Sequence, residues 1–292
     1  MSNALGKSIK QLRINQELTQ KQLAEGICSQ SLLSRVEQGL EIPSVLIIHN
    51  ICQKLGITVD FLLAQSQLDS PLIQLKKELH DLYIQHDYET LYTHLHKKTL
   101  ATFEINTQES YYYFYLGICE LKYKKNNTAG ISALEQALTL SKTDMMQALI
   151  SSYLAPAYYA TNNEVAALQQ LNHCLLFLNK RDFSSELIPA IYHHVALCYG
   201  FSGDNLTAIE YIHLGIDCCK RQNNNFYLSY LFFELGVFFI RTNRKQTGTR
   251  KMKFSLELSA YLDEQFVTAE LTKRRKETIE YANNHIKGDE AQ

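Results

Sequence analysis

Four side chains that can hydrogen-bond with nucleic-acid bases lie close together near the start of the chain. They are Gln30, Ser31, Ser34 and Arg35, and their spacing puts them on one face of a helix. An arginine guanidinium can donate two parallel hydrogen bonds to guanine, and a glutamine amide can pair in a similar way with adenine. A helix that exposes such a face fits the major groove of duplex DNA. The four residues therefore predict a helix that reads DNA.

Short helices with clear start and stop signals must position this face. Thr19 and Gln22 have the spacing of a capping box, so a helix is expected to start at Thr19. Ser29 can cap the next helix, which Gly39 ends, because glycine tolerates a left-handed backbone. Five apolar residues are expected to lock these two helices together: Leu23, Ala24, Ile27, Leu33 and Val36.

The stretch LTQKQLAEGICSQSLLSRVEQG resembles the helix-turn-helix of the XRE/lambda-repressor class, over about 60 residues. In that class, the residue at the start of the second helix contacts a DNA phosphate, aided by the free N–H groups there. The resemblance implies that the DNA-binding residues are Gln20, Gln30, Ser31, Ser34 and Arg35. Which of the last four reads bases stays open, because Arg35 could instead form a structural ion pair with Glu37.

A polar stretch, QSQLDSP at residues 65–71, separates this region from the rest of the chain. Pro71 suits the first turn of a new helix, where its missing N–H does no harm. We expect a helix-turn-helix domain over residues 1–65, a linker helix region over 66–86 and a second domain over 87–292. Only 4 prolines and 12 glycines interrupt the 292 residues, which favours an all-α chain.

The second domain repeats an aliphatic residue followed by a small one. The pairs are Leu116-Gly117, Leu154-Ala155, Val195-Ala196 and Leu235-Gly236, and their small residues are 38, 41 and 40 positions apart. A second small residue follows twelve positions later in each repeat, at Ala129, Ala167, Ala208 and Gly248. A small residue on each helix of a pair lets the two backbones approach closely. The pattern predicts four helical hairpins, with an unspecific helical bundle as the alternative.

The repeats resemble a degenerate tetratricopeptide (TPR) array whose units are slightly longer than the usual ~34 residues. The fold implied is all-α: a lambda-repressor-like domain followed by a right-handed superhelical array of TPR-like hairpins. In such arrays the first helix of each pair lines the concave surface. Here that surface would suit a short hydrophobic peptide, whose carboxylate could meet Lys122 or Arg241. The candidate peptide-binding residues are Phe114, Lys122, Ser152, Tyr159, His193, Phe201, Tyr230, Phe233 and Arg241.

The turn before the third helix is one residue shorter than in most lambda-repressor-like proteins. Together with the order of the parts, it resembles the PlcR and Rgg regulators of quorum sensing, the RRNPP group. This resemblance implies a homodimeric transcription regulator that binds a palindromic operator in double-stranded DNA under the control of a short signalling peptide. Members of the group often clamp the peptide backbone with asparagine at the place that His193 occupies, so this contact would differ here.

Composition and the remaining motifs limit the other functions. No apolar run approaches the ~18–20 residues that span a bilayer, and the N-terminus lacks the apolar core of a secretory signal, so a cytoplasmic location is expected. The seven cysteines are expected to be reduced and buried, although a redox role for Cys218-Cys219 stays open. No histidine pair has a matching ligand cluster, and no phosphate-binding or nucleophile motif occurs. We therefore expect neither a metal, nor a cofactor, nor an enzymatic activity.

Two functions from other classes stay open. The array could dock a partner protein, so that the chain would be a TPR-based protein-interaction regulator. Alternatively, the array could serve dimerisation alone in a constitutive dimeric repressor that has no peptide ligand. The net charge of −1 does not decide between these functions, because a large neutral domain would hide a local cluster of cations.

Overall fold

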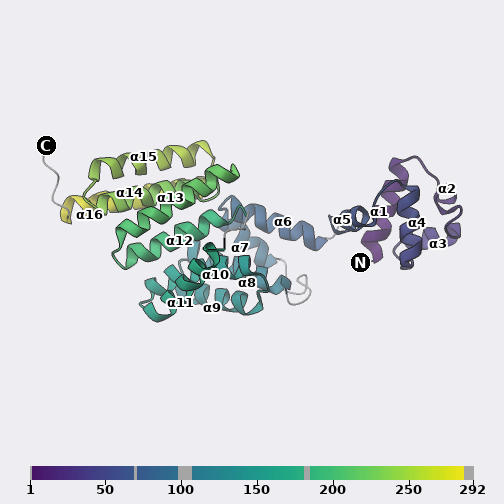
Figure 1. Ribbon diagram of the computed structural model, residues 1–292, viewed down its shortest axis with the longest axis horizontal. Helices are drawn as coiled ribbons and strands as arrows, with labels where there is room; N and C mark the ends of the chain where they lie inside the picture. Colours follow the sequence, from purple (N-terminus) through teal and green to yellow (C-terminus); the bar gives the residue numbers. More distant parts are fainter. Residues whose placement is uncertain (1, 69–70, 98–106, 181–184, 286–292) are drawn as a thin grey trace. The chain divides into compact units, whose positions relative to one another are not determined.

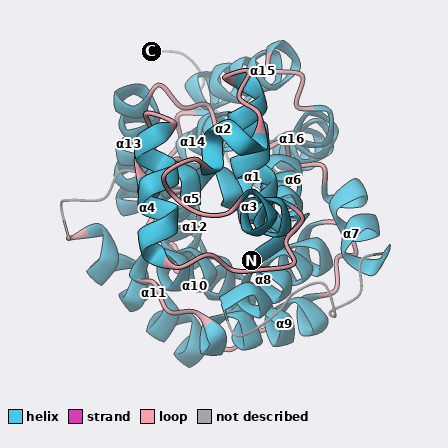
Figure 2. Cartoon of the chain, turned by 90° about the vertical axis from the view of Figure 1, so that its right-hand side faces the viewer, coloured by secondary structure: helices cyan, strands magenta, loops and turns pink. Residues whose placement is uncertain are grey.

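The computed structural model describes residues 2–68, 71–97, 107–180 and 185–285. Every regular element within these ranges is an α-helix, and Figure 2 shows helices and loops there without a strand. The predicted all-α fold is confirmed. In the same ranges, no helix has both the length and the apolar character that crossing a membrane requires.

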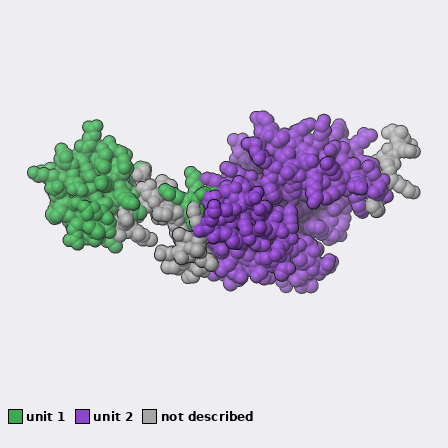
Figure 3. Space-filling model, turned by 180° about the vertical axis from the view of Figure 1, so that it is seen from behind, with its two compact units in different colours: residues 1–80 green, residues 81–292 purple. Residues whose placement is uncertain are grey.

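The chain divides into two compact units, residues 1–80 and 81–292, here called the N-terminal unit and the array unit (Figure 3). The division falls within the segment 66–86 that the sequence predicts as a linker, and the linker role itself stays a prediction. Helix α6 (Pro71–Ile84) belongs to both units, because it continues past His80.

The N-terminal unit begins with five short helices, labelled in Figure 1. They are α1 (Ser2–Asn15), α2 (Gln20–Ala24), α3 (Gln30–Glu37), α4 (Val45–Lys54) and α5 (Val59–Leu68). Their shared core contains four of the five predicted lock residues, Leu23, Ala24, Leu33 and Val36, while Ile27 is partly buried against it. Burial of this apolar face holds α2 against α3.

The helix starts of this unit follow from local sequence. Thr19 and Gln22 form the predicted capping box, in which each side chain satisfies a free backbone N–H of the other residue. Ser29 caps α3 by accepting from the backbone N–H of Leu32. Gly39, with φ +74°, adopts the left-handed backbone after α3 that an L side chain rarely takes.

The array unit contains the end of α6 and then α7 (Tyr88–Lys97). Four hairpins follow: α8 (Thr107–Lys122) with α9 (Asn127–Leu140), α10 (Asp144–Ala160) with α11 (Glu164–Leu178), α12 (Ile188–Phe201) with α13 (Asn205–Gln222), and α14 (Leu228–Arg241) with α15 (Lys245–Tyr261). Helix α16 (Gln265–His285) packs on α14 and α15. Figure 1 shows these helices in chain order, and the four predicted hairpins are confirmed.

Small residues sit where paired helices cross. A Cβ at Gly236 would lie 2.5 Å from Met252 Cγ and 2.6 Å from the carbonyl oxygen of Gly248, so α14 and α15 touch through their backbones. The first hairpin differs from prediction, because its crossing lies at Gly117 and Gly130 instead of Ala129. Its turn is one residue longer than the turns of the later hairpins, which moves the contact one position along α9.

The turns inside three hairpins share one construction. A residue with left-handed backbone (Lys125, Asn162 or Gly203) precedes the N-cap residue of the next helix. The caps are Asn126, Asn163 and Asp204, and each side chain accepts a hydrogen bond from a backbone N–H three residues later. These polar turn residues therefore start α9, α11 and α13.

All seven cysteines lie within the described ranges and are unpaired there. Six are buried, and Cys28 is half-buried. Burial raises the pKa of Cys198 and of Cys219 to about 12, so both thiols stay protonated at neutral pH. These properties fit the expected role of small apolar core residues.

Candidate nucleic-acid interface and peptide-binding face

The exposed face of α3 carries the four predicted base-reading residues. Gln30, Ser31 and Arg35 are exposed, and Ser34 is half-buried. The opposite face of the helix, with Leu33 and Val36, is in the core. Separation of the polar and apolar faces puts donors and acceptors on the accessible side of α3, where they can meet base edges in a major groove.

Arg35 has an exposed partner at the end of the following turn. Its Nε lies 3.2 Å from Glu41 Oε2, and both side chains are accessible to solvent. The alternative that Arg35 pairs with Glu37 is wrong, because the Glu37 carboxylate points into the unit. An exposed ion pair of this kind contributes little to stability and leaves the guanidinium able to exchange partners.

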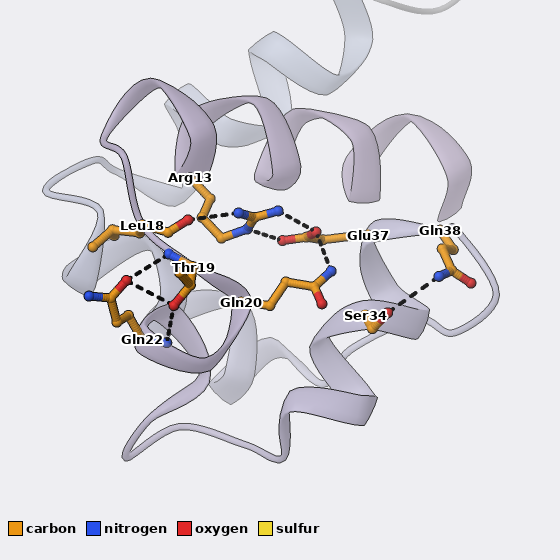
Figure 4. Close-up of polar contacts among 8 residues, drawn as sticks. All are labelled: Arg13, Leu18, Thr19, Gln20, Gln22, Ser34, Glu37 and Gln38. Carbon is orange, nitrogen blue, oxygen red and sulfur yellow. Dashed lines mark hydrogen bonds and ion pairs between the residues drawn. The ribbon is translucent and has the colours of Figure 1, made fainter.

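Glu37 instead forms a buried ion pair with Arg13 of α1 (Figure 4). The Arg13 guanidinium donates from Nε to Oε1 at 2.6 Å and from Nη2 to Oε2 at 2.9 Å, and it also donates to the carbonyl oxygen of Leu18. Gln20 Nε2 donates to Glu37 Oε2 at 2.8 Å. The pair therefore holds the Gln20 amide at the N-terminus of α2, the place predicted to meet a DNA phosphate.

The nine predicted peptide contacts on the array differ in exposure. Five of them are at most 2% exposed and form no open surface: Phe114, Ser152, His193, Tyr230 and Phe233. The expectation of an open aromatic lining at these positions is not met. Periodicity placed them on the first helices of the hairpins, but it could not show which other segments cover those helices.

One covering segment is the turn between α6 and α7. Tyr83, at the end of α6, packs edge-on against Phe114 with ring centroids 5.5 Å apart. Its hydroxyl forms a 2.9 Å hydrogen bond with Tyr153, whose hydroxyl forms a 2.7 Å hydrogen bond with Tyr227. This chain of phenols joins α6 to α10 and to the start of α14 through the buried interior.

The other covering segment is α16. The Arg274 guanidinium lies 4.8 Å from the ring centroid of Phe233 and forms a 2.5 Å ion pair with Glu234. Burial alone would raise the pKa of Glu234, but the positive charge of Arg274 and the hydrogen bonds to the carboxylate lower it to about 2. Tyr230 donates a 2.7 Å hydrogen bond to Glu270. Charges and hydrogen bonds therefore hold α16 over α14.

Lys122 lies beside this buried network. Its ammonium is 5.5 Å from the ring centroid of Tyr230, and burial lowers its pKa while the Glu270 carboxylate opposes that change. The predicted cation on the first hairpin thus faces the carboxylate of α16. A ligand carboxylate would have to compete with Glu270 to reach it.

The remaining predicted contacts lie in an open region. Phe201 is 54% exposed and stacks with the half-buried Tyr159 at 5.7 Å between centroids. Arg241 is exposed and donates to the carbonyl oxygen of Gly200 at 3.2 Å. A cleft of about 660 Å³ runs along this region, within the 300–1,000 Å³ range typical of ligand sites. Its walls are Gly200, Phe201, Asn205, Val237, Ile240, Arg241, Glu277, Thr278 and Tyr281.

Comparison with known families decides the nature of the N-terminal unit. Residues 9–62 match the family model described as Helix-turn-helix. Residues 9–62 are a helix-turn-helix domain. No curated protein matches the sequence. In this helix-turn-helix domain, α2 and α3 are the two helices that the predicted lock residues hold together.

Solved structures extend the comparison beyond the helix-turn-helix domain. The chain is similar to Bacillus thuringiensis PlcR in complex with the peptide PapR7 and DNA, with TM-score 0.68 and 20% identity over 92% of this chain and 99% of that one. PlcR in its apo form matches with TM-score 0.65 and 17% identity, over 98% of this chain and 100% of that one. ComR from S. thermophilus, in complex with DNA and its signalling peptide ComS, matches with TM-score 0.56 and 12% identity, over 94% of this chain and 99% of that one. At these identities the likeness concerns the fold, and the predicted architecture is confirmed.

Several residues of these sites were not predicted. Arg13 lies four positions after the apolar Ile9, on the same face of its helix, and Glu37 directly follows the apolar Val36. A charged residue beside an expected core position was the signal that could have identified them. Glu234 interrupts the apolar run LFFELGVFF, which was a similar signal. No local pattern pointed to Arg274, because its partner Glu234 is 40 positions away in the sequence.

Proposed function

We propose that the protein is a DNA-binding transcription regulator whose operator binding is controlled by a short hydrophobic peptide. It acts in the cytoplasm as a homodimer on a palindromic operator. The observation that carries the proposal is the fold likeness over almost the whole chain to PlcR, solved with both a peptide and DNA. The helix-turn-helix domain with its exposed polar face on α3 supports the DNA part.

The residues proposed to contact DNA are Gln30, Ser31, Ser34 and Arg35 on α3, with Gln20 on a phosphate. The polar side chains of the α3 residues lie on its accessible face. The buried ion pair between Arg13 and Glu37 holds Gln20 in place through the hydrogen bond from Gln20 to Glu37. Two copies would place their α3 helices in successive major grooves, about 34 Å apart, on a palindromic site.

The peptide is proposed to bind along the open cleft lined by Phe201 and Arg241. The two stacked rings of Tyr159 and Phe201 offer apolar contact, and Arg241 offers a cation for a terminal or side-chain carboxylate. The buried candidates, such as Phe114 and Phe233, would contact a peptide only after the segments that cover them have moved.

A selection experiment tests the DNA part. The full-length protein is mixed with a pool of random duplexes, and the bound fraction is enriched and sequenced. We expect a palindrome with two half-sites. Recovery of no enriched sequence, with or without peptide, would contradict the proposal. Recovery of a site that is bound equally in both cases would favour the constitutive repressor.

A peptide screen tests the second part. A pool of short synthetic hydrophobic peptides is added to the protein, and ligands are detected by a rise in melting temperature and a change in operator affinity. We expect Arg241→Gln to weaken a detected peptide by about 1.5–3 kcal/mol, the worth of a charged hydrogen bond. Arg250→Gln, an exposed arginine on α15, is the matched control and should leave the affinity unchanged.

A further inference from the structure

The α6–α7 turn inserts one imidazole into a cage of aromatic rings. His86 is fully buried and stacks on Phe226, with centroids 5.3 Å apart and 12° between the planes. Tyr88, Tyr227 and Tyr230 meet the same imidazole edge-on at 5.8, 5.3 and 5.4 Å. Its Nδ1 is 2.8 Å from the Tyr88 hydroxyl. These four rings are the aromatic cage.

Among the other left-handed residues in the described turns of the array, Tyr227 alone is also buried, and it is itself a wall of the cage. Lys125, Asn162, Asn243 and Asp263 have nearly the same φ as His86, between +57° and +62°, and all four side chains are exposed. A polar exposed residue is what such a turn ordinarily accepts. At His86 the same backbone carries a ring into the interior instead.

One feature makes this insertion costly. The buried Nε2 of His86 has no hydrogen-bond partner among the described residues. His86 faces Tyr227 in the cage, and both have left-handed backbone, with φ +58° and +63°. Histidine tolerates this backbone better than a bulky residue such as tyrosine does. An unsatisfied buried polar atom costs free energy, so less free energy is needed to withdraw His86 from the cage than to withdraw a fully satisfied side chain.

We propose that the aromatic cage is a side-chain pocket for an aromatic or imidazole ring of a bound peptide, and that the α6–α7 turn fills it with His86 when no peptide is present. The proposal rests on the peptide-binding function proposed above. The ligand class follows from the walls, because flat rings on several sides select a flat ring. The Tyr88 hydroxyl would serve one polar edge of that ring.

The same exchange would release the end of α6. Tyr227 belongs to the cage and also to the phenol chain that leads through Tyr153 to Tyr83. The His86 and Asp87 amides donate back to the carbonyl oxygens of Tyr83 and Leu82, so the turn and the last residues of α6 are one hydrogen-bonded piece. Withdrawal of His86 from the cage would therefore loosen the array's hold on α6.

Hydrogen exchange on the unmodified protein tests whether the turn can leave. The reporters are the amides of residues 86–91, compared with those of residues 148–155 in α10. If the turn opens locally, we expect at least about tenfold lower protection in the turn, with an opening that low urea hardly changes. Equal protection and equal urea dependence would mean that His86 is ordinary core, and the proposal would be overturned.

Ring complementation tests the pocket. His86→Gly removes the imidazole and suits the left-handed backbone, and Asn162→Gly makes the same backbone change in an exposed turn. With N-acetyltyrosinamide as probe, we expect a saturable rise in melting temperature for H86G and none for N162G. N-acetylalaninamide, which lacks a ring, should act on neither variant.

Two outcomes would overturn the pocket: an H86G protein that is helical by circular dichroism yet ignores the ring probe, or both variants responding alike. If H86G does not fold, the exchange experiment on the unmodified protein decides. Neither experiment uses DNA or a peptide ligand. Failure of the proposed regulatory function would therefore be seen separately from failure of the cage.

Discussion

Arg13 and Glu37 join the first and third helices of the helix-turn-helix domain through a buried, two-pronged ion pair. Residues of opposite charge that are 24 positions apart thereby fix the angle between α1 and α3. The same carboxylate accepts a hydrogen bond from Gln20, so the pair also sets the start of α2. The exposed polar face of α3 depends on this hidden contact.

Glu37→Ala should lower the free energy of unfolding by about 3–5 kcal/mol, because Arg13 would be left charged, buried and unpaired. Urea denaturation followed by circular dichroism measures the change. Arg35→Ala breaks the exposed pair with Glu41 and should cost less than about 1 kcal/mol. Equal losses in the two variants would contradict the assignment of Arg13–Glu37 as the structural pair.

Arg35→Ala should weaken operator binding by about 1–3 kcal/mol if its guanidinium makes a bidentate contact with guanine. The measurement is a gel shift or fluorescence titration on the selected operator at fixed salt. Glu41→Gln removes the partner of Arg35 but keeps the cation, so it should not weaken binding. Unchanged affinity of the Arg35→Ala protein would remove this residue from the DNA interface.

Gly236→Ala should destabilise the array by about 1–3 kcal/mol, since its Cβ would press on the backbone of α15 at Gly248. Thermal melting reports the loss. Ala260→Ser is the control, because Ala260 is exposed on the same α15. A stable Gly236→Ala protein would show that α14 and α15 are free to separate.

The array should lose stability as the pH falls below about 6.5. Burial lowers the pKa of His86 to about 3, and it also lowers the pKa values of His193 and His194 below their ordinary 6.5. The unfolded chain thus binds protons that the folded chain refuses, so stability is full above pH 6.5 and declines between 6.5 and about 3. Each of these histidines lowers the free energy of unfolding by up to about 1.4 kcal/mol for every pH unit below 6.5.

Urea denaturation at a series of pH values between 8 and 5 measures how the free energy of unfolding changes with pH, above the ordinary pKa values of carboxylates. A flat profile over this range would show that the three histidines are accessible to protons in the folded protein.

Local signals in the sequence predicted much of the fold. The Thr19–Gln22 capping box, the Ser29 cap and the Gly236–Gly248 crossing are all encoded within one turn or one hairpin, and the structure contains each of them. The first crossing was misplaced by one residue, because the small-residue spacing assumed hairpin turns of equal length.

The buried interior of the array could not be predicted in the same way. Phe114 and Tyr230 lie on the expected helices, yet other parts of the chain reach them. Tyr83 packs on Phe114, and both His86 and the α16 residue Glu270 contact Tyr230. Helical periodicity assigns a residue to a face of its own helix but carries no information about a distant segment that packs on that face. For this reason the open cleft around Phe201 became visible only in three dimensions.

The repeated turns of the array affect the order in which it folds. In three hairpins a turn pair starts the second helix: Lys125–Asn126, Asn162–Asn163 and Gly203–Asp204. Three of the four hairpins carry their own start signal, and each hairpin mostly touches its neighbours, which gives the low contact order of rapidly folding helical proteins. The phenol hydrogen bonds bridge 70 and 74 positions, so their closure needs hairpins that already stand in place. Refolding should accordingly show a fast rise in helicity, and tyrosine burial should trail behind it.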